Sequence, residues 1–371
     1  MARLRAAVIG LGRIASTIDD EIQKYDDDEL PRSHIGCYAE HPAIDLVGMS
    51  DTWPEQREAA RRKWRFDALY DDFREMLRAT KPEIVSVCTS AMPRADVLLE
   101  IANGGYGVKA IWSEKPITIS LDEADRVIDA CRRAGIVLAV NCQWRWRGVN
   151  RQALDIINDG VIGSVQHVQA LGQCGLSHNG SHLLTSLTMF AGARAAWVVG
   201  EVESDAAAAS DNDFQGAGYI GFPNGVRGYF RSLPNGPNEW SWEITGATGM
   251  IRLYGASAAA ELWTMADPLP GMRRRPATRQ FLPSPLRPRS AMLHALDDLV
   301  RCVQTGDAPK CSGEDAREAL EIAIATRESH RRGRVRVDLP LEDRRLRIIS
   351  SEVVRFSIPR AVARARGVAG A

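Results

Sequence analysis

Apolar and polar positions alternate with two different periods along the first part of the chain. Short apolar runs, typical of buried strands, lie at residues 5–9, 44–50, 84–88, 108–112 and 136–141, and helical patterns lie between them at 54–63, 71–79, 94–103 and 121–134. Ser120 and Glu123 form a capping-box pattern at the last of these helices, and Gly135 marks its end. Strands that alternate with helices indicate βαβ units. We therefore predict an α/β fold: a Rossmann-type, doubly wound parallel sheet with helices on both faces.

Beyond about residue 142 the pattern changes and predicts mainly consecutive strands. One helix at 149–159 precedes strand-like runs at 164–173, 196–203, 214–222, 226–233, 239–246, 249–254 and 259–265. Pro223-Asn224-Gly225 is a hairpin signal between two of them. The Pro- and Arg-rich residues 267–290 indicate a loop, and two helices follow at 290–304 and 313–330, the second capped by Ser312. We predict a C-terminal α+β domain with a large, mostly antiparallel open sheet.

Length and composition limit the function classes. A chain of 371 residues is long for one core, so we expect a domain at 1–142, a domain at 143–340 and an Arg-rich tail at 341–371. Lys plus Arg equals Asp plus Glu, 47 each, which gives no reason to expect a nucleic acid or a membrane as partner. Seven scattered cysteines without a C-x-x-C pair favour reduced thiols in a cytoplasm and argue against a zinc site. No signal peptide and no membrane-spanning apolar run are evident.

A glycine-rich turn follows the first predicted strand and reads Gly-Leu-Gly-Arg-Ile-Ala. This is the G-x-G-x-x-[G/A] spacing that lets a backbone approach a pyrophosphate at a helix N-terminus. Gly10 permits the tight turn, Gly12 leaves room for the phosphates, and Ala15 lets the helix pack on the strand. With Arg13 and Ile14 between them, these residues predict a dinucleotide site.

Asp51 ends the second predicted strand. A carboxylate there accepts hydrogen bonds from the adenosine ribose hydroxyls and repels the additional phosphate of NADP. The separation from the glycines exceeds the usual spacing, and an insert at 19–36 accounts for the excess. Because Thr-Trp-Pro follows Asp51 and no arginine does, we predict NAD rather than NADP. The alternative is that Asp51 is only a turn residue.

Lys115 follows the strand at 108–112 within the sequence Ser-Glu-Lys-Pro. A lysine at the carboxyl end of a parallel strand points into the crevice where open α/β sheets bind ligands. Desolvation there would favour its neutral form, which suits acid–base chemistry. The alternative is an exposed turn lysine that pairs with Glu114.

Two histidines precede a predicted helix at 183–190, which Ser177 or Asn179 would cap. His178 and His182 are four residues apart, so both lie on one face if the first turn is helical. Three interpretations stay open: active-site acid–base residues, a capped structural pair, or a zinc pair, which lacks an adjacent glutamate and an obvious third ligand.

Together these motifs resemble the Gfo/Idh/MocA oxidoreductases, the family of glucose-fructose oxidoreductase and inositol 2-dehydrogenase. The resemblance covers about residues 5–335 and rests on the glycine turn, Glu114-Lys115-Pro116 and the helix that opens with Gly-Ser-His at 180–182. Asn141 followed by Arg145, and Asp-Gly-Val-Ile-Gly at 159–163, are similar to the family's entry into its second domain.

The resemblance implies hydride transfer between a nicotinamide and a secondary alcohol of a sugar or cyclitol. It implies that Lys115 holds or protonates the reacting oxygen and that His182 is the acid–base or substrate-orienting residue. Thr89 and Glu114 join the predicted cofactor contacts, and a cis bond is expected before Pro116.

The chain also departs from the family's pattern. Where members often read Asp-x-Gly-x-His-x-x-Asp, it has His178, Gly180, His182 and Thr185. The usual carboxylate beside the histidine is missing, so proton transfer would rest on Lys115, on His178 paired with His182, or on a residue not yet placed.

Several further residues are candidate substrate contacts. Arg94 would favour an acidic substrate, or else is a solvated helix residue. Trp144, Arg145 and Trp146 would form a stacking wall with a charged contact, or else pack between the domains. The insert at 19–36 would be a lid that brings His34 to the substrate, or else an acidic surface loop. Asn179 completes the set.

The sequence thus predicts an NAD-dependent oxidoreductase that acts on a sugar, sugar derivative or cyclitol, without a metal. The exposed face of the second sheet favours a homodimer or homotetramer. A nucleic-acid role for the tail is disfavoured because it has few aromatic residues to stack on bases. Two alternatives stay open: a redox-neutral NAD-dependent glycosidase or lyase, and a nucleotide-binding regulator without catalysis.

Overall fold

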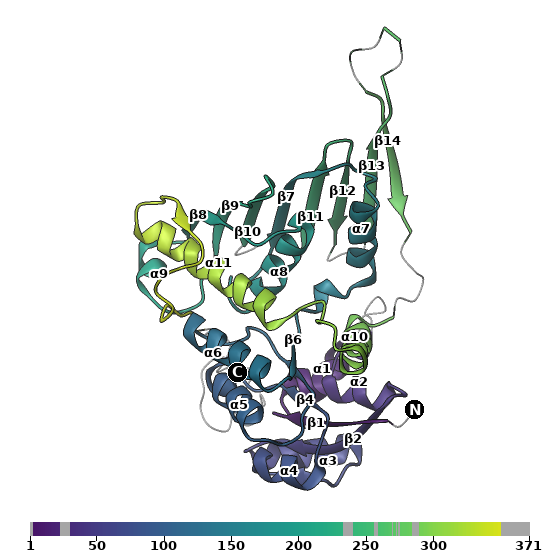
Figure 1. Cartoon of the computed structure of the whole chain (residues 1–371), viewed down its shortest axis with the longest axis vertical. Coiled ribbons are helices and arrows are strands. Elements are labelled where there is room, and N and C mark those ends of the chain that lie inside the picture. The colour runs from purple at the N-terminus through teal and green to yellow at the C-terminus, as the bar shows by residue number, and fades with distance from the viewer. Residues whose placement is uncertain are drawn as a thin grey trace. The chain divides into compact units, whose positions relative to one another are not determined.

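A computed structural model describes residues 3–22, 30–232, 240–255, 259–268, 270–271, 273, 275–283 and 289–349 (Figure 1). The chain divides into two compact units, each described by itself. The first comprises Met1–Gln143 and Arg289–Arg317, and the second Trp144–Pro288 and Glu318–Ile348. The first boundary lies next to the predicted one, but residues 289–317 belong to the first unit and not to the predicted domain at 143–340.

Side-chain contacts explain that correction. The hydroxyl of Ser290 donates to the carbonyl of Pro31 at 2.5 Å, and His41 contacts Asp297 at 3.0 Å. Residues 139 and 312 also form a β-bridge. The chain therefore returns to the first unit late in the sequence, and no local pattern marks such a return.

The first unit contains a six-stranded parallel sheet in the order β3-β2-β1-β4-β5-β6. The strands are β1 (Leu4–Ile9), β2 (Ile44–Ser50), β3 (Leu69–Tyr70), β4 (Ile84–Val87), β5 (Ala110–Ser113) and β6 (Val137–Val140). This strand order confirms the prediction of a doubly wound sheet. The strand order reverses direction between β1 and β4, and doubly wound sheets bind ligands beyond the carboxyl ends of the strands at such a point. The two-residue β3 was not predicted because it is too short to show a period.

The helices of the first unit connect and cover these strands. They are η1 (Arg13–Thr17), α1 (Ile18–Ile22), α2 (His34–Glu40), α3 (Pro54–Trp64), α4 (Phe73–Thr80), α5 (Ala91–Asn103), α6 (Leu121–Arg133) and α10 (Ala291–Thr305), while α11 (Gly313–Arg331) crosses the division between the units. The Ser120 hydroxyl accepts from the Glu123 amide at 3.2 Å, and the Glu123 carboxylate accepts from the Ile119 amide at 3.2 Å. Ser312 accepts from the Asp315 amide at 3.2 Å. Both predicted caps are confirmed.

Within the 19–36 insert, Asp19 and residues 33–36 are buried in the unit rather than forming a lid. Asp19 accepts from the amides of Arg32 at 2.7 Å and Ser33 at 2.9 Å. The Ser33 hydroxyl caps α2 by accepting from the Gly36 amide at 3.0 Å, and His34 is completely buried. The prediction of a lid is therefore wrong for these residues, and residues 23–29 lie outside the described part of the chain.

The second unit contains a nine-stranded sheet in the order β14-β13-β12-β11-β7-β10-β9-β8-β15. The strands are β7 (Val165–Gly172), β8 (Trp197–Val202), β9 (Gly216–Gly221), β10 (Arg227–Ser232), β11 (Ser241–Gly246), β12 (Gly249–Tyr254), β13 (Ala259–Met265), β14 (Ala277–Leu282) and β15 (Val337–Asp338). Every neighbouring pair is antiparallel except β7 and β10, which confirms the prediction. β14 falls in a predicted loop, because its residues are almost all exposed and show no alternating burial.

Helices of the second unit include η2 (Gln143–Arg145), α7 (Gly148–Asn158), α8 (Gly180–Ala191) and α9 (Asp205–Ala209). Every residue of α8 is buried, and the helix packs on β7 and β10 (Figure 1). None of the helices in the described ranges is long and apolar enough to cross a membrane.

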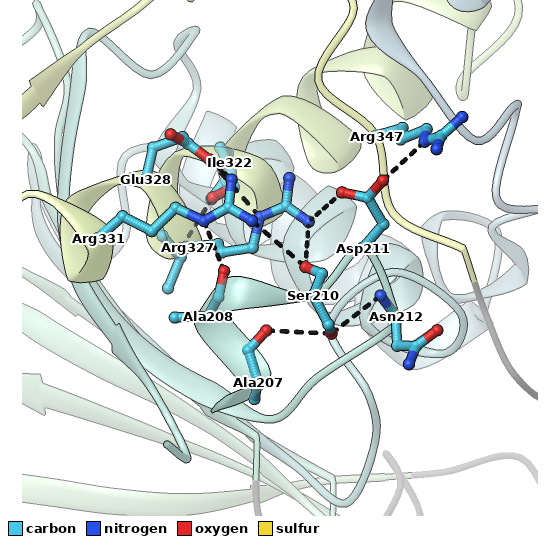
Figure 2. Close-up of polar contacts among 11 residues, drawn as sticks. Ala207, Ala208, Ser210, Asp211, Asn212, Ile322, Arg327, Glu328, Arg331 and Arg347 are labelled. Carbon is cyan, nitrogen blue, oxygen red and sulfur yellow. Dashed lines mark hydrogen bonds and ion pairs between the residues drawn. The ribbon is translucent and has the colours of Figure 1, made fainter. Parts of the chain in front are cut away.

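A cluster of arginines, of which Arg327 is buried, connects α11 with the segment that follows α9. Arg327 is completely buried and donates to the Ser210 carbonyl at 3.0 Å, while Arg347 donates to Asp211 at 2.8 Å (Figure 2). Burial, reinforced by the charge of Arg331, lowers the pKa of Arg327. The start of the predicted tail is therefore packed on this unit through residues 341–348, and residues 350–371 lie outside the described part.

Candidate active site

The glycine turn sits at the carboxyl end of β1, directly against the end of β4. Gly10 has a φ of +86°, and a Cβ added there would lie 2.9 Å from the carbonyl carbon of Cys88 and 3.0 Å from the amide nitrogen of Thr89. Only glycine fits both that backbone conformation and that contact. Gly12 has a φ of −71° and directly precedes η1. A left-handed backbone conformation is therefore not the reason for a glycine at this position.

The Asp51 side chain is hydrogen-bonded to the same turn. Its Oδ2 accepts from the Leu11 amide at 2.7 Å and its Oδ1 accepts from the Trp53 amide at 2.9 Å. Burial raises the pKa of this carboxyl, and the two amide hydrogen bonds oppose the rise. The end of β2 is thereby joined to the middle of the glycine turn.

The sequence interpretation missed one cation near Asp51. Arg57 in α3 donates from Nη1 to the backbone carbonyl of Asp51 at 2.7 Å. Arg57 lies one helical turn beyond the residues that directly follow Asp51. Its guanidinium is anchored on the backbone of Asp51, three positions before the first residue of α3.

Thr89 supplies a buried polar atom at the turn. Its Oγ1 is inaccessible and has no hydrogen-bond partner within the described residues, and its backbone abuts Gly10. Buried hydroxyls are normally hydrogen-bonded, so a lone one beside such a turn is what a missing ligand would leave behind. Together with the tight approach at Gly10, this atom shows that the residues present fit a dinucleotide.

The Glu114-Lys115-Pro116 turn follows β5. The peptide bond between Lys115 and Pro116 is cis, as predicted. The Glu114 amide donates to the Val87 carbonyl at 2.9 Å, so the turn is held against the end of β4. Lys115 is half-buried, and its amide donates to Glu114 Oε2 at 3.2 Å.

Arg94 ties this turn to the loop after β4. It is 3% exposed and donates to the carbonyls of Thr89 and Pro116. Burial lowers the pKa of Arg94 to about 10, against the opposing charge of Glu114. The prediction of a solvated helix residue is wrong, because the guanidinium holds two loops of the crevice together.

Glu114 is buried inside the unit rather than displayed on it. Its Oε1 accepts from Asn141 Nδ2 at 2.5 Å and lies 3.1 Å from His34 Nε2. His34 therefore faces the core below the turn and not a lid, which corrects its assignment as a substrate contact. Its position could not be read from the sequence, since it lies 80 residues from Glu114.

The histidine turn belongs to the second unit. Asn179 precedes α8 but its side chain makes no capping hydrogen bond, and neither does Ser177, so the predicted cap is wrong. Instead, Asp213 accepts from the amides of Ser177 at 2.8 Å and His178 at 3.0 Å. His182 is 7% exposed.

Asp213 is the functional candidate that sequence reasoning missed. It follows α9 in an Asp-Asn-Asp stretch, and a Cβ added at Gly175 would lie 2.5 Å from its Oδ2. It places a carboxylate at the histidine turn of a chain that lacks the usual one in the helix itself. The only signal in the sequence was the absence of a carboxylate from the helix at 183–190. That absence does not indicate where in the chain another carboxylate takes its place.

The aromatic residues at the start of the second unit are core residues. The Trp144 ring lies 5.2 Å from that of Trp240 and 4.8 Å from that of Trp242. Trp144 and Trp146 are 7% and 1% exposed. Packing within this unit replaces both predicted alternatives, while Arg145 donates to the Thr185 carbonyl at 3.1 Å.

Within the described ranges, no group of three or more His, Cys, Asp or Glu side chains is arranged to hold a metal ion. In the first unit the glycine turn, Asp51 and the Glu-Lys-Pro turn follow the carboxyl ends of β1, β2 and β5 of a doubly wound sheet. This arrangement is typical of a Rossmann-type nucleotide-binding unit.

Comparison with known proteins agrees. Residues 4–142 match the model of the Gfo/Idh/MocA oxidoreductase family, described as an NAD-binding Rossmann fold. Over these residues the chain is similar to the Gfo/Idh/MocA oxidoreductases.

Two curated relatives and one solved structure show how far the likeness extends. D-glucoside 3-dehydrogenase of Escherichia coli is 28% identical over 47% of this chain and 45% of its own length, and D-apiose dehydrogenase of Paraburkholderia graminis is 27% identical over 82% and 85%. The chain thus spans less than half of the first relative. Levoglucosan dehydrogenase in complex with NADH and levoglucosan matches with a TM-score of 0.73 at 18% identity, over 91% of this chain and 100% of that one, which shows the shared fold.

Proposed function

We propose that this chain is an NAD-dependent dehydrogenase that transfers a hydride between nicotinamide and a secondary alcohol, or the matching ketone, of a sugar, sugar derivative or cyclitol. The observation that carries the proposal is the hydrogen bond from the Leu11 amide to Asp51 Oδ2 at 2.7 Å. Because of this hydrogen bond, a carboxylate lies at the turn that would hold the dinucleotide. The substrate class is supported by the names of the relatives, which are dehydrogenases of a glucoside and of apiose.

The first unit would hold the cofactor through residues of the glycine turn and the strand ends beside it. Bound NAD supplies the hydride acceptor or donor. The proposed contacts are Gly10, Gly12, Arg13, Ile14, Asp51 and Thr89. Preference for NAD over NADP follows from the Asp51 carboxylate, which repels a 2′-phosphate, while the Arg57 guanidinium donates to the backbone carbonyl of Asp51.

Lys115 is proposed to hold or move the proton of the reacting oxygen at its Nζ. The hydrogen bonds of Glu114 and Arg94 fix the backbone on both sides of Lys115, which limits the positions that the amine can take. A positioned acid–base group contributes about 10²–10⁴-fold to rate. Glu114 itself is proposed as a support of this turn, because both of its carboxylate oxygens are engaged within the unit.

His182 is proposed as the second acid–base or substrate-orienting residue, with His178 and Asn179 beside it. Asp213 holds the backbone of this turn through the Ser177 and His178 amides. We assign to Asp213 the positioning role that the missing helix carboxylate would otherwise have.

A turnover screen tests the proposal. Wild type, Lys115→Ala and Lys109→Ala are assayed with NAD⁺ and a panel of inositols, aldoses and methyl glycosides. Lys109 is the control because it directly precedes β5, the strand that Lys115 follows. Its side chain is 57% exposed and pairs with Glu83. We expect Lys115→Ala to lose about 10²-fold or more in turnover with NADH binding unchanged, and Lys109→Ala to retain activity.

Full activity of Lys115→Ala on a substrate of the wild type would contradict the role of Lys115. Cleavage of a glycoside with no net change in NADH would instead identify a redox-neutral glycosidase or lyase. NADH binding without turnover on any member of the panel would favour a regulator.

A further inference from the structure

A chain of buried polar groups lies beneath the Glu114-Lys115-Pro116 turn. Tyr38 Oη is 2.7 Å from Ser86 Oγ, Ser86 Oγ is 2.8 Å from His34 Nδ1, and His34 Nε2 is 3.1 Å from Glu114 Oε1. His34 comes from α2, Ser86 from β4, and Glu114 follows β5. Tyr38, Ser86 and His34 are 2%, 0% and 0% exposed. His34 therefore joins β4 to the Glu114 carboxyl group that follows β5.

The direction of the hydrogen bond between His34 and Glu114 follows from the charge of Glu114. Burial by itself would raise the pKa of Glu114, but the hydrogen bond and charge of His34, the charge of Lys115 and the hydrogen bond of Asn141 together lower it to about 2. An ionised carboxylate only accepts, so His34 Nε2 carries a hydrogen and donates it. The other charged or titratable groups that act on this site are Arg94 of α5 and Cys88 at the end of β4.

His34 is the largest of the contributions that keep Glu114 ionised. A carboxyl this deeply buried without such a partner takes up a proton, and buried glutamates reach pKa values of about 8–9. The chain of polar groups ends at Tyr38, which is itself buried, and not at the surface. It is therefore suited to fixing a charge and an orientation rather than to carrying protons to solvent.

The ring of His34 is itself held in place. Its centroid lies 4.1 Å from that of Trp112, the residue that precedes Ser113 in β5. With Ser86 on one ring nitrogen and Glu114 on the other, rotation of the imidazole would break both hydrogen bonds. The donor is thus pre-positioned before any ligand binds.

We propose that His34 is a positioning residue for Lys115: it holds Glu114 in its charged form and in one orientation beside that lysine. The inference rests on the proposed role of Lys115 in the reaction. The Glu114 carboxylate in turn favours the ammonium form of Lys115, so that His34 sets, through Glu114, how readily this amine gives up its proton.

The test measures Lys115 directly and needs neither cofactor nor substrate. Full-length wild type, His34→Leu, His34→Gln, Glu114→Gln and Tyr38→Phe are labelled at pH 7 with an amine-reactive reagent, and peptide mass spectrometry gives the labelling rate of Lys115 relative to Lys109. Lys109 serves as the internal reference, because it is exposed and pairs with Glu83.

We expect His34→Leu and Glu114→Gln each to raise the ratio of Lys115 to Lys109 labelling by about tenfold, equivalent to ~1.4 kcal/mol. His34→Gln, which keeps a donor, should stay within about threefold of the wild type. Tyr38→Phe removes a buried hydroxyl from the same chain but leaves the His34–Glu114 contact, so its ratio should not change. If His34 had a purely structural role, Tm would fall in all the His34 and Tyr38 variants. The ratio of Lys115 to Lys109 labelling would then not differ between these variants in the way described.

The proposal is overturned if Glu114→Gln raises the ratio while His34→Leu leaves it at the wild-type value, or if neither changes it. Should His34→Leu fail to fold, ¹⁵N NMR of the wild-type histidines decides, with His34 assigned by His34→Gln. A protonated Nε2 between pH 6 and 8 supports the inference, and an unprotonated Nε2 overturns it. Absence of dehydrogenase turnover would count against the proposed function alone, because neither readout depends on it.

Discussion

Replacement of Gly10 by alanine tests whether the turn between β1 and η1 has the shape that the sequence motif implies. An alanine at φ +86° carries the cost of the left-handed region, about 1–2 kcal/mol. Its Cβ would also lie 2.9 Å from the Cys88 carbonyl carbon, and relief of such an overlap costs about 1–3 kcal/mol. We expect Gly10→Ala to lower the free energy of unfolding by roughly 2–5 kcal/mol, and to weaken NADH binding because the turn must move.

Gly107 offers a matched control in the same unit. Its φ is +80°, and nothing lies within 4 Å of a Cβ added there. Gly107→Ala therefore carries the backbone cost without the overlap. Urea unfolding and NADH fluorescence titration of both variants separate the two contributions. Equal stability of Gly10→Ala and Gly107→Ala, with unchanged NADH binding in both, would refute the reasoning.

Further predictions concern the histidine turn of the second unit and the Glu114-Lys115-Pro116 turn of the first. Asp213→Ala should lower stability by about 1–3 kcal/mol, because two part-buried amides lose their acceptor, and should reduce turnover with NADH binding unchanged. Unaltered turnover would contradict its positioning role. The lowered pKa of Glu114 means that its contribution to stability is complete above its unfolded pKa of 4.5 and is lost as pH falls toward about 2. The urea midpoint of the wild type should therefore fall more steeply below pH 4.5 than that of Glu114→Gln, and parallel curves would contradict this. Arg94→Met should lower Tm and also slow turnover, since Arg94 holds the carbonyls of Thr89 and Pro116; a loss of Tm alone would restrict it to stability.

Local signals were sufficient for the five longer strands of the first unit and for several of its turns. The parallel strands, the caps at Ser120 and Ser312 and the cis bond before Pro116 all follow from residues that are neighbours in the sequence. β14 was missed because its side chains face solvent and so lack an apolar period. Period-based prediction depends on burial, and an exposed edge strand offers none.

The candidate site divides in the same way. Short motifs predict Gly10 and Asp51 as cofactor contacts, and the structure joins Asp51 to the glycine turn through the Leu11 amide. The contact of His34 with Glu114 and the hold of Asp213 on the His178 amide join residues that are 80 and 35 apart. Such contacts depend on how the elements pack, which one sequence does not state. The acidic insert was misjudged for the same reason, since Asp19 is acidic by composition but accepts buried amide hydrogen bonds.

The most direct measurement of the central claim is a fluorescence titration of the purified protein with NADH and, separately, NADPH, repeated on Asp51→Ala. Wild type should bind NADH more tightly than NADPH. Asp51→Ala should weaken NADH binding and reduce the preference for NADH over NADPH, because it loses the proposed ribose acceptor and the hydrogen bond to the Leu11 amide. Binding of neither nucleotide by the wild type, or a preference left unchanged by Asp51→Ala, would contradict the account.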